Sequence, residues 1–262
     1  MQTNRRGFIK VAGLAALGFV VAKPVFDFFV RMQSTKASTT ALTPAQTTTT
    51  TKWGMAINMK ACSERDDCRE CINACHSYHN VPDIDNKEEG IKWIYKAPFE
   101  KVFPEHENEF IASGMKEVPI ILLCNHCKHP PCIKVCPTKA TWKREDGIVM
   151  MDYHRCIGCR YCMGGCPYGS RSFNWKYPRP FIREVNPDFP TRTRGVVEKC
   201  NFCAKRLSQG LSPACVEACP EKALTFGNLL DHESEISEIL RTHNIIRRLP
   251  ELGTDPNIYY YG

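Results

Sequence analysis

The sequence predicts an α+β fold with two pseudo-symmetric lobes and several inserts, and three observations indicate it. The 262-residue chain contains sixteen cysteines, which fall into four groups of four with none left over. Between residues 53 and 226, the cysteine groups alternate with short apolar segments of the length expected for β-strands. Residues 135–141 (VCPTKAT) are echoed by residues 218–224 (ACPEKAL), as expected for a duplicated unit.

The four cysteine groups share a tight spacing, and three of them end in Cys-Pro. In chain order, the groups are Cys62, Cys68, Cys71 and Cys75; Cys124, Cys127, Cys132 and Cys136; Cys156, Cys159, Cys162 and Cys166; and Cys200, Cys203, Cys215 and Cys219. The third group reads C-x2-C-x2-C-x3-C-P, the thiolate spacing of a bacterial ferredoxin that holds [4Fe–4S] clusters. Since each cluster takes four thiolates, the cysteines predict four [4Fe–4S] clusters in two ferredoxin-like lobes.

Disulfides, structural zinc and covalent haem are the other uses of so many cysteines. Disulfide frameworks belong to short secreted chains with scattered spacings rather than to repeated C-x2-C runs. A zinc ribbon needs only two separated C-x2-C pairs, and the crossed ligation of a two-cluster ferredoxin has no purpose there. A c-type haem needs C-x-x-C-H, which does not occur in the chain. A zinc-stabilised scaffold without redox activity is kept as the alternative from another class.

The charge pattern excludes one class of partner. The net charge is +7 but no lysine- or arginine-rich block occurs, so nucleic acid is not expected to bind. Four basic residues lie beside predicted cluster ligands, namely Lys60, Arg155, Arg160 and Lys199. They could balance the negative charge of the clusters, and the alternative for each is a solvated surface side chain.

The N-terminal segment resembles a twin-arginine (Tat) export signal. Residues 4–10 read Asn-Arg-Arg-Gly-Phe-Ile-Lys, and an apolar run follows at residues 11–22. The Tat route carries folded proteins, as a protein loaded with clusters in the cytoplasm would require. Residues 1–33 are predicted to be a Tat signal or a retained membrane anchor, because about 20 helical residues span roughly 30 Å. The folded part is then expected on the periplasmic or extracytoplasmic face of the cytoplasmic membrane.

Three segments follow the signal. Residues 34–52 are a Thr-rich linker of low complexity. Residues 53–230 hold every cysteine and are expected to form the four-cluster ferredoxin-like domain. Residues 231–262 are expected to form a C-terminal helix and tail packed on that domain, because Ile236, Ile239, Leu240 and Ile245 recur at roughly helical spacing.

Within the domain, the pattern predicts short β elements. Residues 120–123 read as a buried strand, and residues 173–175 and 224–226 as short strands after later cysteines. Residues 141–143 and 148–151 read as a hairpin around the turn at Asp146-Gly147. The two inner cysteine groups are close in sequence and are expected to share one lobe, while the first and fourth groups form the other.

Two inserts separate these elements. Residues 76–123 are polar and contain prolines, and they are expected to be a surface elaboration between the lobes. Residues 176–195 contain four prolines and are expected to be an irregular loop, which serves either as a docking surface or as a passive connector.

Residues 53–262 resemble the four-cluster ferredoxin-like electron-transfer subunits of membrane-bound oxidoreductases, of the DMSO reductase, polysulfide reductase and nitrite-reductase-associated type. The resemblance is carried by segments that read CNHCKHPPC (124–132), CIGCRYC (156–162), GCPYG (165–169) and GTDPNIYY (253–260). Residues 146–156, 170–175 and 192–200 are most similar to the DsrO type, the iron–sulfur subunit of the DsrMKJOP complex associated with sulfite reduction.

The resemblance implies that the groups pair crosswise, so that the fourth cysteine of each group ligates another cluster. The implied ligands are Cys62, Cys68, Cys71 and Cys219 for cluster A; Cys75, Cys200, Cys203 and Cys215 for cluster B; Cys124, Cys127, Cys132 and Cys166 for cluster C; and Cys136, Cys156, Cys159 and Cys162 for cluster D. Cys62 departs from the family pattern, because the first step is C-x5-C instead of C-x2-C.

The resemblance also implies a non-catalytic electron-transfer subunit in a complex linked to dissimilatory sulfur metabolism. The implied partners are an NrfD-like, quinone-binding membrane subunit (DsrP type) and a multihaem cytochrome c (DsrJ type). A haem b membrane subunit (DsrM type) and a heterodisulfide-reductase-like subunit (DsrK type) acting on the sulfur carrier DsrC would complete the complex. The alternative keeps the fold and changes the partner to a molybdopterin reductase of the tetrathionate, polysulfide or nitrite type.

Overall fold

The computed structural model describes residues 51–262 except residues 66, 87 and 107–115. The chain divides into two compact units, Met1–Thr48 and Thr49–Gly262, and every described residue belongs to the second. The predicted signal or anchor at 1–33 and all but the end of the predicted linker at 34–52 lie outside the described residues. In the described part, no helix has the length and apolar character needed to cross a membrane.

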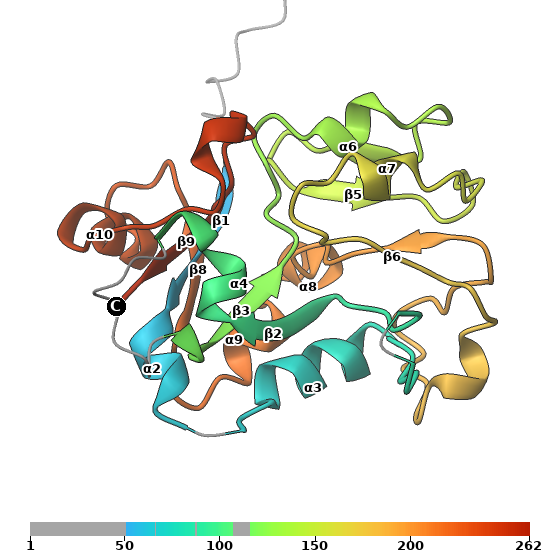
Figure 1. Ribbon diagram of the computed structural model, residues 1–262, viewed down its shortest axis with the longest axis horizontal. Coiled ribbons are helices and arrows are strands. Elements are labelled where there is room, and N and C mark those ends of the chain that lie inside the picture. The colour runs from blue at the N-terminus through green and yellow to red at the C-terminus, as the bar shows by residue number, and fades with distance from the viewer. Residues whose placement is uncertain (1–50, 66, 87, 107–115) are drawn as a thin grey trace, which may run out of the picture. The chain divides into compact units, whose positions relative to one another are not determined.

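A three-stranded sheet brings together the first and last described strands (Figure 1). Its central strand, β1 (Trp53–Asn58), pairs antiparallel with β8 (Leu224–Asn228) and parallel with β9 (Ile258–Tyr261). Strand β1 has four successive buried residues and packs on both of its faces, as a central strand should. The sheet therefore depends on segments that are about 200 residues apart in sequence.

Helix α10 (Glu235–Thr242) packs against this sheet. It begins at Ser234, whose hydroxyl accepts a hydrogen bond from the Ser237 amide and so caps the helix. Ile236 and Ile239 face Ala56 of β1 and Tyr261 of β9. The helix lies where the apolar spacing predicted one, although it ends at Thr242, before Ile245. Residues 250–252 then form the short helix η3 (Pro250–Leu252).

A second sheet shows that one sequence prediction was wrong. Residues 76–123 were expected to be a surface elaboration, but they contribute β2 (Ile94–Pro98), which pairs antiparallel with β3 (Pro119–Leu123). Trp93, Ile94 and Phe103 are almost completely buried in the main core. The physical reason is that the buried strand β3 must satisfy its backbone hydrogen bonds, and β2 is the partner that does so. Helix α4 (Phe99–Val102) and η1 (Pro104–His106) continue from β2.

The cysteine-bearing helices form two pairs. Helix α3 (Glu70–Tyr78) contacts α9 (Ala214–Glu217), with α2 (Met59–Ser63) and α8 (Ala204–Ser208) completing the lobe made by the first and fourth groups. Helix α6 (Pro131–Lys134) contacts α7 (Tyr161–Gly164) in the lobe made by the two inner groups. Figure 1 shows the second pair above β6, and α3 with α9 below β2 and β3. This division agrees with the lobes predicted from the spacing of the groups.

Two hairpin-like pairs of strands belong to the inner lobe. Strand β4 (Thr141–Lys143) pairs with β5 (Val149–Met151), and Gly147 in the connecting turn has φ +89°, which glycine adopts without strain. This is the hairpin that the sequence predicted. Strand β6 (Ser172–Phe173) pairs with β7 (Val197–Glu198), and the residues between them are irregular apart from the short helix η2 (Arg179–Phe181).

A buried ion pair fixes the irregular segment 176–195 to the core. Arg192 and Glu198 are completely buried, and Arg192 Nη2 lies 2.5 Å from Glu198 Oε2. Glu198 also accepts hydrogen bonds from Trp93 Nε1 (2.9 Å) and Asn174 Nδ2 (2.6 Å). Arg192 donates to the carbonyls of His79 and Asn80. The network therefore joins the loop, β7, the segment before β2 and the end of α3.

The Arg192→Met variant should lose about 3–5 kcal/mol of unfolding free energy, because it leaves the buried Glu198 carboxylate without its partner. Arg183→Met is the matched control, since it breaks an exposed pair with Asp83 at 2.6 Å, which we expect to contribute at most about 1 kcal/mol. Thermal unfolding of both variants under anaerobic conditions measures the difference. Equal losses in the two variants would contradict the structural role given to Arg192.

Candidate iron–sulfur cluster sites

Left-handed backbone turns shape the loops that carry the cysteines. The residue three positions after each Cys-Pro cysteine has a positive φ: Lys139 (54°), Gly169 (62°) and Lys222 (46°). The shared turn makes the three loops alike, although only one of them has glycine there. Inside the C-x2-C steps, His126, Gly158 and Phe202 also have positive φ and turn the chain so that both flanking thiols can face one point.

In the first lobe, two sets of thiols lie close together: set A, which is Cys62, Cys68, Cys71 and Cys219, and set B, which is Cys75, Cys200, Cys203 and Cys215. Burial, together with smaller effects of the nearby thiols of Cys62, Cys219 and Cys68, raises the pKa of Cys71 to about 12. Those four cysteines are set A. Burial likewise raises the pKa of Cys75 far above its ordinary value, followed by the effects of Cys215, Cys200 and Cys203, which complete set B. Cys62 joins its set despite its longer C-x5-C step.

The inner lobe brings together most of the other two sets. Burial, together with smaller effects of the neighbouring thiols of Cys124, Cys166 and Cys132 in set C, raises the pKa of Cys127 to about 12. The pKa of Cys162 in set D is raised by burial and then by Cys156 and Cys136, while Arg171 lowers it. Cys159, the fourth member of set D, is exposed.

The four sets also form a row in the order A, B, C, D. Cys71 of set A is one of the thiols that raise the pKa of Cys75 in set B, after the effect of burial. Cys124 of set C acts in the same way on the pKa of Cys200 in set B. Sets C and D meet where α6, with Cys132, packs on α7, with Cys162.

Exposure differs along this row. All four thiols of set B are buried, as are three of the four in set C. Set A at one end has three half-buried cysteines, and set D at the other end has the exposed Cys159 and the half-buried Cys136 and Cys156. Set B is therefore closed to solvent and set C is closed except at the half-buried Cys166, while both ends of the row reach the surface.

Backbone and side-chain donors surround the sulfur atoms. The amides of Phe202, Ala214 and Ala223 donate to Sγ of Cys200, Cys203 and Cys219 at 3.3–3.4 Å. Arg171 Nη2 donates to Cys132 Sγ at 3.1 Å. Partial burial would raise the pKa of Cys136, but hydrogen bonds from residues 138–141 lower it below its ordinary value. N–H groups that donate to sulfur stabilise the negative charge on it, and an iron–sulfur cluster with thiolate ligands needs such donors around it.

The donor set therefore fits [4Fe–4S] clusters. Each set supplies soft sulfur ligands, and the buried thiols would lose their protons only as iron binds, since burial raises their pKa values. Among the described residues, no three His, Cys, Asp or Glu side chains are placed to hold a single metal ion.

Sequence reasoning missed the side chains that lie between the sets. Arg171 had no predicted role, and His126 is fully buried and stacked on Phe202 with ring centroids 3.7 Å apart. Lys199 was expected to be either a counter-charge or a solvated side chain, and it is 1% exposed. Lys60, Arg155 and Arg160 are exposed, as the alternative for each of them expected. The sequence showed basic residues beside cysteines, but this pattern did not distinguish a buried counter-charge from a solvated side chain.

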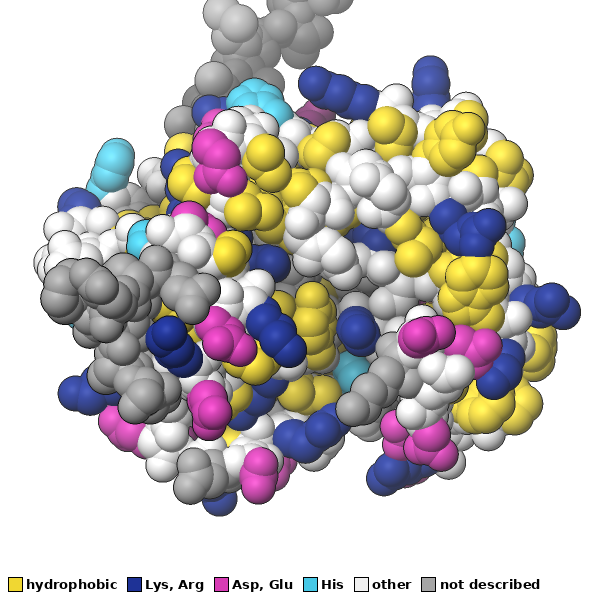
Figure 2. Space-filling view, viewed as in Figure 1, with side chains coloured by type: hydrophobic (Ala, Val, Ile, Leu, Met, Phe, Trp, Pro, Cys, Tyr) yellow, Lys and Arg dark blue, Asp and Glu magenta, His cyan; other side chains and the backbone are white. Residues whose placement is uncertain are grey.

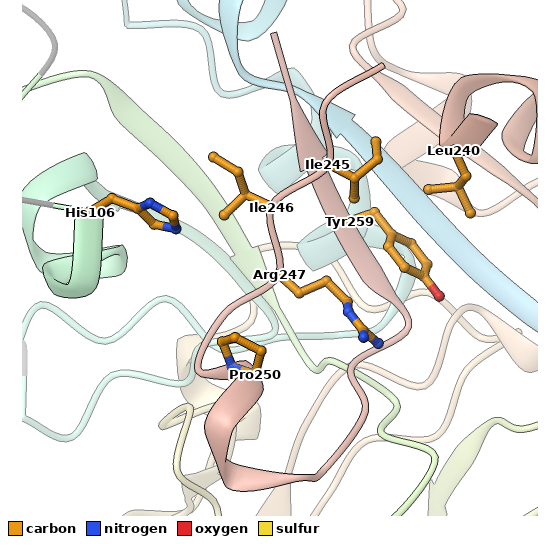
Figure 3. Close-up of a pocket in the computed structure, with 7 residues that line it drawn as sticks. All are labelled: His106, Leu240, Ile245, Ile246, Arg247, Pro250 and Tyr259. Carbon is orange, nitrogen blue, oxygen red and sulfur yellow. The ribbon is translucent and has the colours of Figure 1, made fainter. Parts of the chain in front are cut away.

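The surface has a groove that reaches one of the thiols and a separate cavity that does not. A groove of about 980 Å³ reaches Cys68 at the set A end and is also lined by Arg69, Lys92, Lys96 and Lys101. A cavity of about 520 Å³ lies between α10 and the tail, and Arg247 and Tyr259, which line it, lie side by side on neighbouring segments (Figure 3). No cysteine lines this second cavity, so it is separate from the cluster sites.

The set D end has an apolar surface. Ile157 and Tyr161, which flank Cys159 in sequence, are 67% and 68% exposed. Trp142, Trp175 and Tyr177 are also exposed large hydrophobic side chains. Figure 2 shows hydrophobic side chains gathered on the side of the molecule where Figure 1 places α6, α7 and β6. Grouped apolar side chains of this size are typical of a surface that another protein covers.

The fold and the four thiol sets define an iron–sulfur protein of the ferredoxin-like class. The family model described as "4Fe-4S dicluster domain" matches residues 119–179 and 186–229. An iron–sulfur subunit 1 of an Hdr-like menaquinol oxidoreductase from Archaeoglobus fulgidus is 40% identical, with 98% of this chain and 97% of the relative aligned.

Two further relatives are oxidoreductase subunits. The iron–sulfur cluster-binding subunit of a menaquinone reductase from Nitratidesulfovibrio vulgaris is 38% identical over 80% of this chain and 88% of its own length. A tetrathionate reductase subunit from Salmonella typhimurium is 35% identical over 80% of this chain and 72% of its own length. The chain belongs to this family of iron–sulfur electron-transfer subunits of membrane-associated oxidoreductases, and it binds [4Fe–4S] clusters. The alternative of a redox-inactive zinc scaffold is thereby set aside.

The Gly158→Ala variant should lose cluster D. Gly158 has φ +70°, and a Cβ there would lie 2.3 Å from the carbonyl oxygen of Gly195, so the Cys156–Cys159 loop would have to move. Gly164→Ala, in α7, is the matched control, because a Cβ at that position meets nothing within 4 Å. Iron analysis should show a loss of about four atoms per chain for the first variant and none for the second. Identical iron contents would mean that the loop tolerates the added methyl group.

Proposed function

We propose that this chain relays single electrons through four [4Fe–4S] clusters, A to D, in a membrane-bound respiratory redox complex. The observation that supports it best is the row of thiol sets, in which B is buried and C is buried except for the half-buried Cys166, while A and D reach the surface. Such a row would let charge enter at one end and leave at the other without contact with solvent in between. The direction of flow depends on potentials, which span about −700 to +450 mV for such clusters.

The clusters would supply the one-electron chemistry, and the chain's residues would hold and shield them. The amides of Phe202, Ala214 and Ala223 point at sulfur and would stabilise the more negative, reduced state. Buried Phe202, with His126 stacked on it, excludes water beside Cys200 and Cys203. The chain itself would have no catalytic residues, and conversion of substrate would take place in its partners.

We propose that the partners include an NrfD-like, quinone-interacting membrane subunit (DsrP type) and a multihaem cytochrome c (DsrJ type). A haem b protein and a heterodisulfide-reductase-like subunit (DsrM and DsrK types) would link the complex to dissimilatory sulfur metabolism. Two observations support this. The relatives from Archaeoglobus and Nitratidesulfovibrio are named for menaquinol or menaquinone, and the former is described as Hdr-like. Its 98% coverage also includes most of the segment before residue 51.

The proposed location is the extracytoplasmic face of the cytoplasmic membrane, reached by the Tat route. Its support is the Arg5-Arg6 pair followed by Phe-Ile-Lys and an apolar run. The apolar surface around Cys159 would face a partner subunit there.

A molybdopterin reductase is the second candidate partner, because a tetrathionate reductase subunit is also a relative. Purification of the complex from native membranes distinguishes the two. Cytochrome c and haem b proteins that copurify with the chain would support the first candidate. A molybdenum-containing catalytic subunit in their place would overturn it in favour of the second.

The Cys62→Ala variant tests the assignment of ligands to clusters. The native protein, isolated anaerobically, should hold about sixteen iron atoms and show four one-electron centres in an EPR-monitored redox titration. The variant should perturb cluster A alone, because the thiols that lie near Cys62, those of Cys71 and Cys219, both belong to set A. Cys159→Ala is the matched comparison at the other end and should perturb cluster D alone. Loss of every EPR signal in the Cys62→Ala variant would show that the pairing is wrong or that the fold collapses.

A further inference from the structure

Two cationic side chains are buried at the inner junctions of the row of thiol sets. Lys199 is 1% exposed and lies between sets B and C, and Arg171 is 5% exposed and lies between sets C and D. Cations are rarely buried, because removing a charge from water is costly unless other groups compensate it. The surroundings of both side chains show what compensates them.

Lys199 joins the first lobe to the inner one. Its Nζ donates to the carbonyl oxygens of Cys200 (2.6 Å) and Val149, and the Val149 amide donates to His126 Nδ1 at 3.0 Å. Burial raises the pKa values of Cys200 in set B and Cys132 in set C, and the charge of Lys199 lowers both. The ammonium group therefore lies between Cys200 of set B and Val149, which packs in one cluster with Cys132 of set C.

Arg171 lies at the next junction of the row, between sets C and D. Its Nη2 donates to Cys132 Sγ at 3.1 Å and to Thr141 Oγ1 at 2.8 Å, and its Nη1 lies 3.7 Å from Met151 Sδ. It also lowers the pKa of Cys162 in set D, which burial raises. The planar guanidinium thus holds its charge beside Cys132 of set C, on helix α6, which packs on α7 with Cys162 of set D.

A fixed positive charge stabilises the state of a cluster that carries the extra electron. The effect depends on distance and on screening, so a buried cation acts far more strongly than an exposed one. Arg160 provides the contrast within the chain. It adjoins Cys159 in sequence, but it is exposed and stacks over Trp175 at 4.6 Å instead of pointing to sulfur.

We propose that Lys199 and Arg171 set the reduction potentials of the inner clusters, with Lys199 raising those of B and C and Arg171 those of C and D. This inference rests on the proposed relay function. Cluster C lies near both charges, so its reduction potential is the one that they raise most. The two residues are positioning residues, since they donate to ligand backbone or ligand sulfur and not to a substrate.

An EPR-monitored redox titration of the anaerobically isolated protein tests the proposal without assigning signals to individual clusters. Lys199→Gln should lower two of the four midpoint potentials, and so should Arg171→Gln. The double variant should lower three, with one shifted by about the sum of its two single shifts. Arg160→Gln is the control and should leave all four potentials nearly unchanged, because solvent already screens Arg160.

The two proposals fail in different ways. Fewer than four reducible centres in the native protein would overturn the relay of four clusters, whatever the variants do. Four centres whose potentials do not move in the neutral variants, or that all move together, would overturn the role of the two cations. If Lys199→Gln or Arg171→Gln assembles fewer clusters than the native protein, the Arg171→Lys variant is measured instead. That variant keeps the positive charge, so its potentials should stay near the native values, and a fall in two of them would refute the proposal.

Discussion

The requirement that four thiols meet at one point governs this fold. In the proposed ligand scheme, each cysteine group supplies three members to one set and its last member to another, so no group would complete a set by itself. The first lobe draws its thiols from residues 62–75 and 200–219, and the inner lobe lies between them in sequence. Short helices and left-handed turns suffice as secondary structure, because iron–sulfur ligation would supply much of the cohesion that a larger apolar core gives other proteins.

Buried charge is the second feature that this architecture has to accommodate. Thiolate sets bring negative charge into the interior, and Lys199 and Arg171 bring positive charge to the same places. Arg192 and Glu198 differ, because they compensate each other and hold an irregular loop against α3 and β7. The protein therefore contains buried cations that lie beside the sulfur sets and a buried ion pair that stabilises the fold.

Much of the fold could be predicted from cysteine spacing, because ligand geometry leaves the backbone few choices. The division of the cysteine groups between two lobes was predicted from their spacing, and the β4–β5 hairpin and α10 follow from local patterns. Strand β2 could not be predicted, since Ile94–Pro98 follows a polar stretch and its role depends on pairing with β3. The burial of Lys199 and Arg192 was also beyond local reasoning, because a charged residue is buried only where distant groups compensate it. The order of the sets depends on the proximity of Cys124 and Cys200, which no spacing encodes.

The position of β1 has a consequence for biosynthesis. This strand emerges early from the ribosome, but both of its neighbours, β8 and β9, are among the last segments to be made. The inner lobe can close over a short stretch of chain, whereas the outer lobe must wait for almost the complete polypeptide, at the entropic cost of a very long loop. Sets A and B, which need the cysteines of residues 200–219, would therefore be completed late in synthesis, and a chain stalled or truncated before Ile258 would keep an open sheet edge that quality-control proteases can recognise.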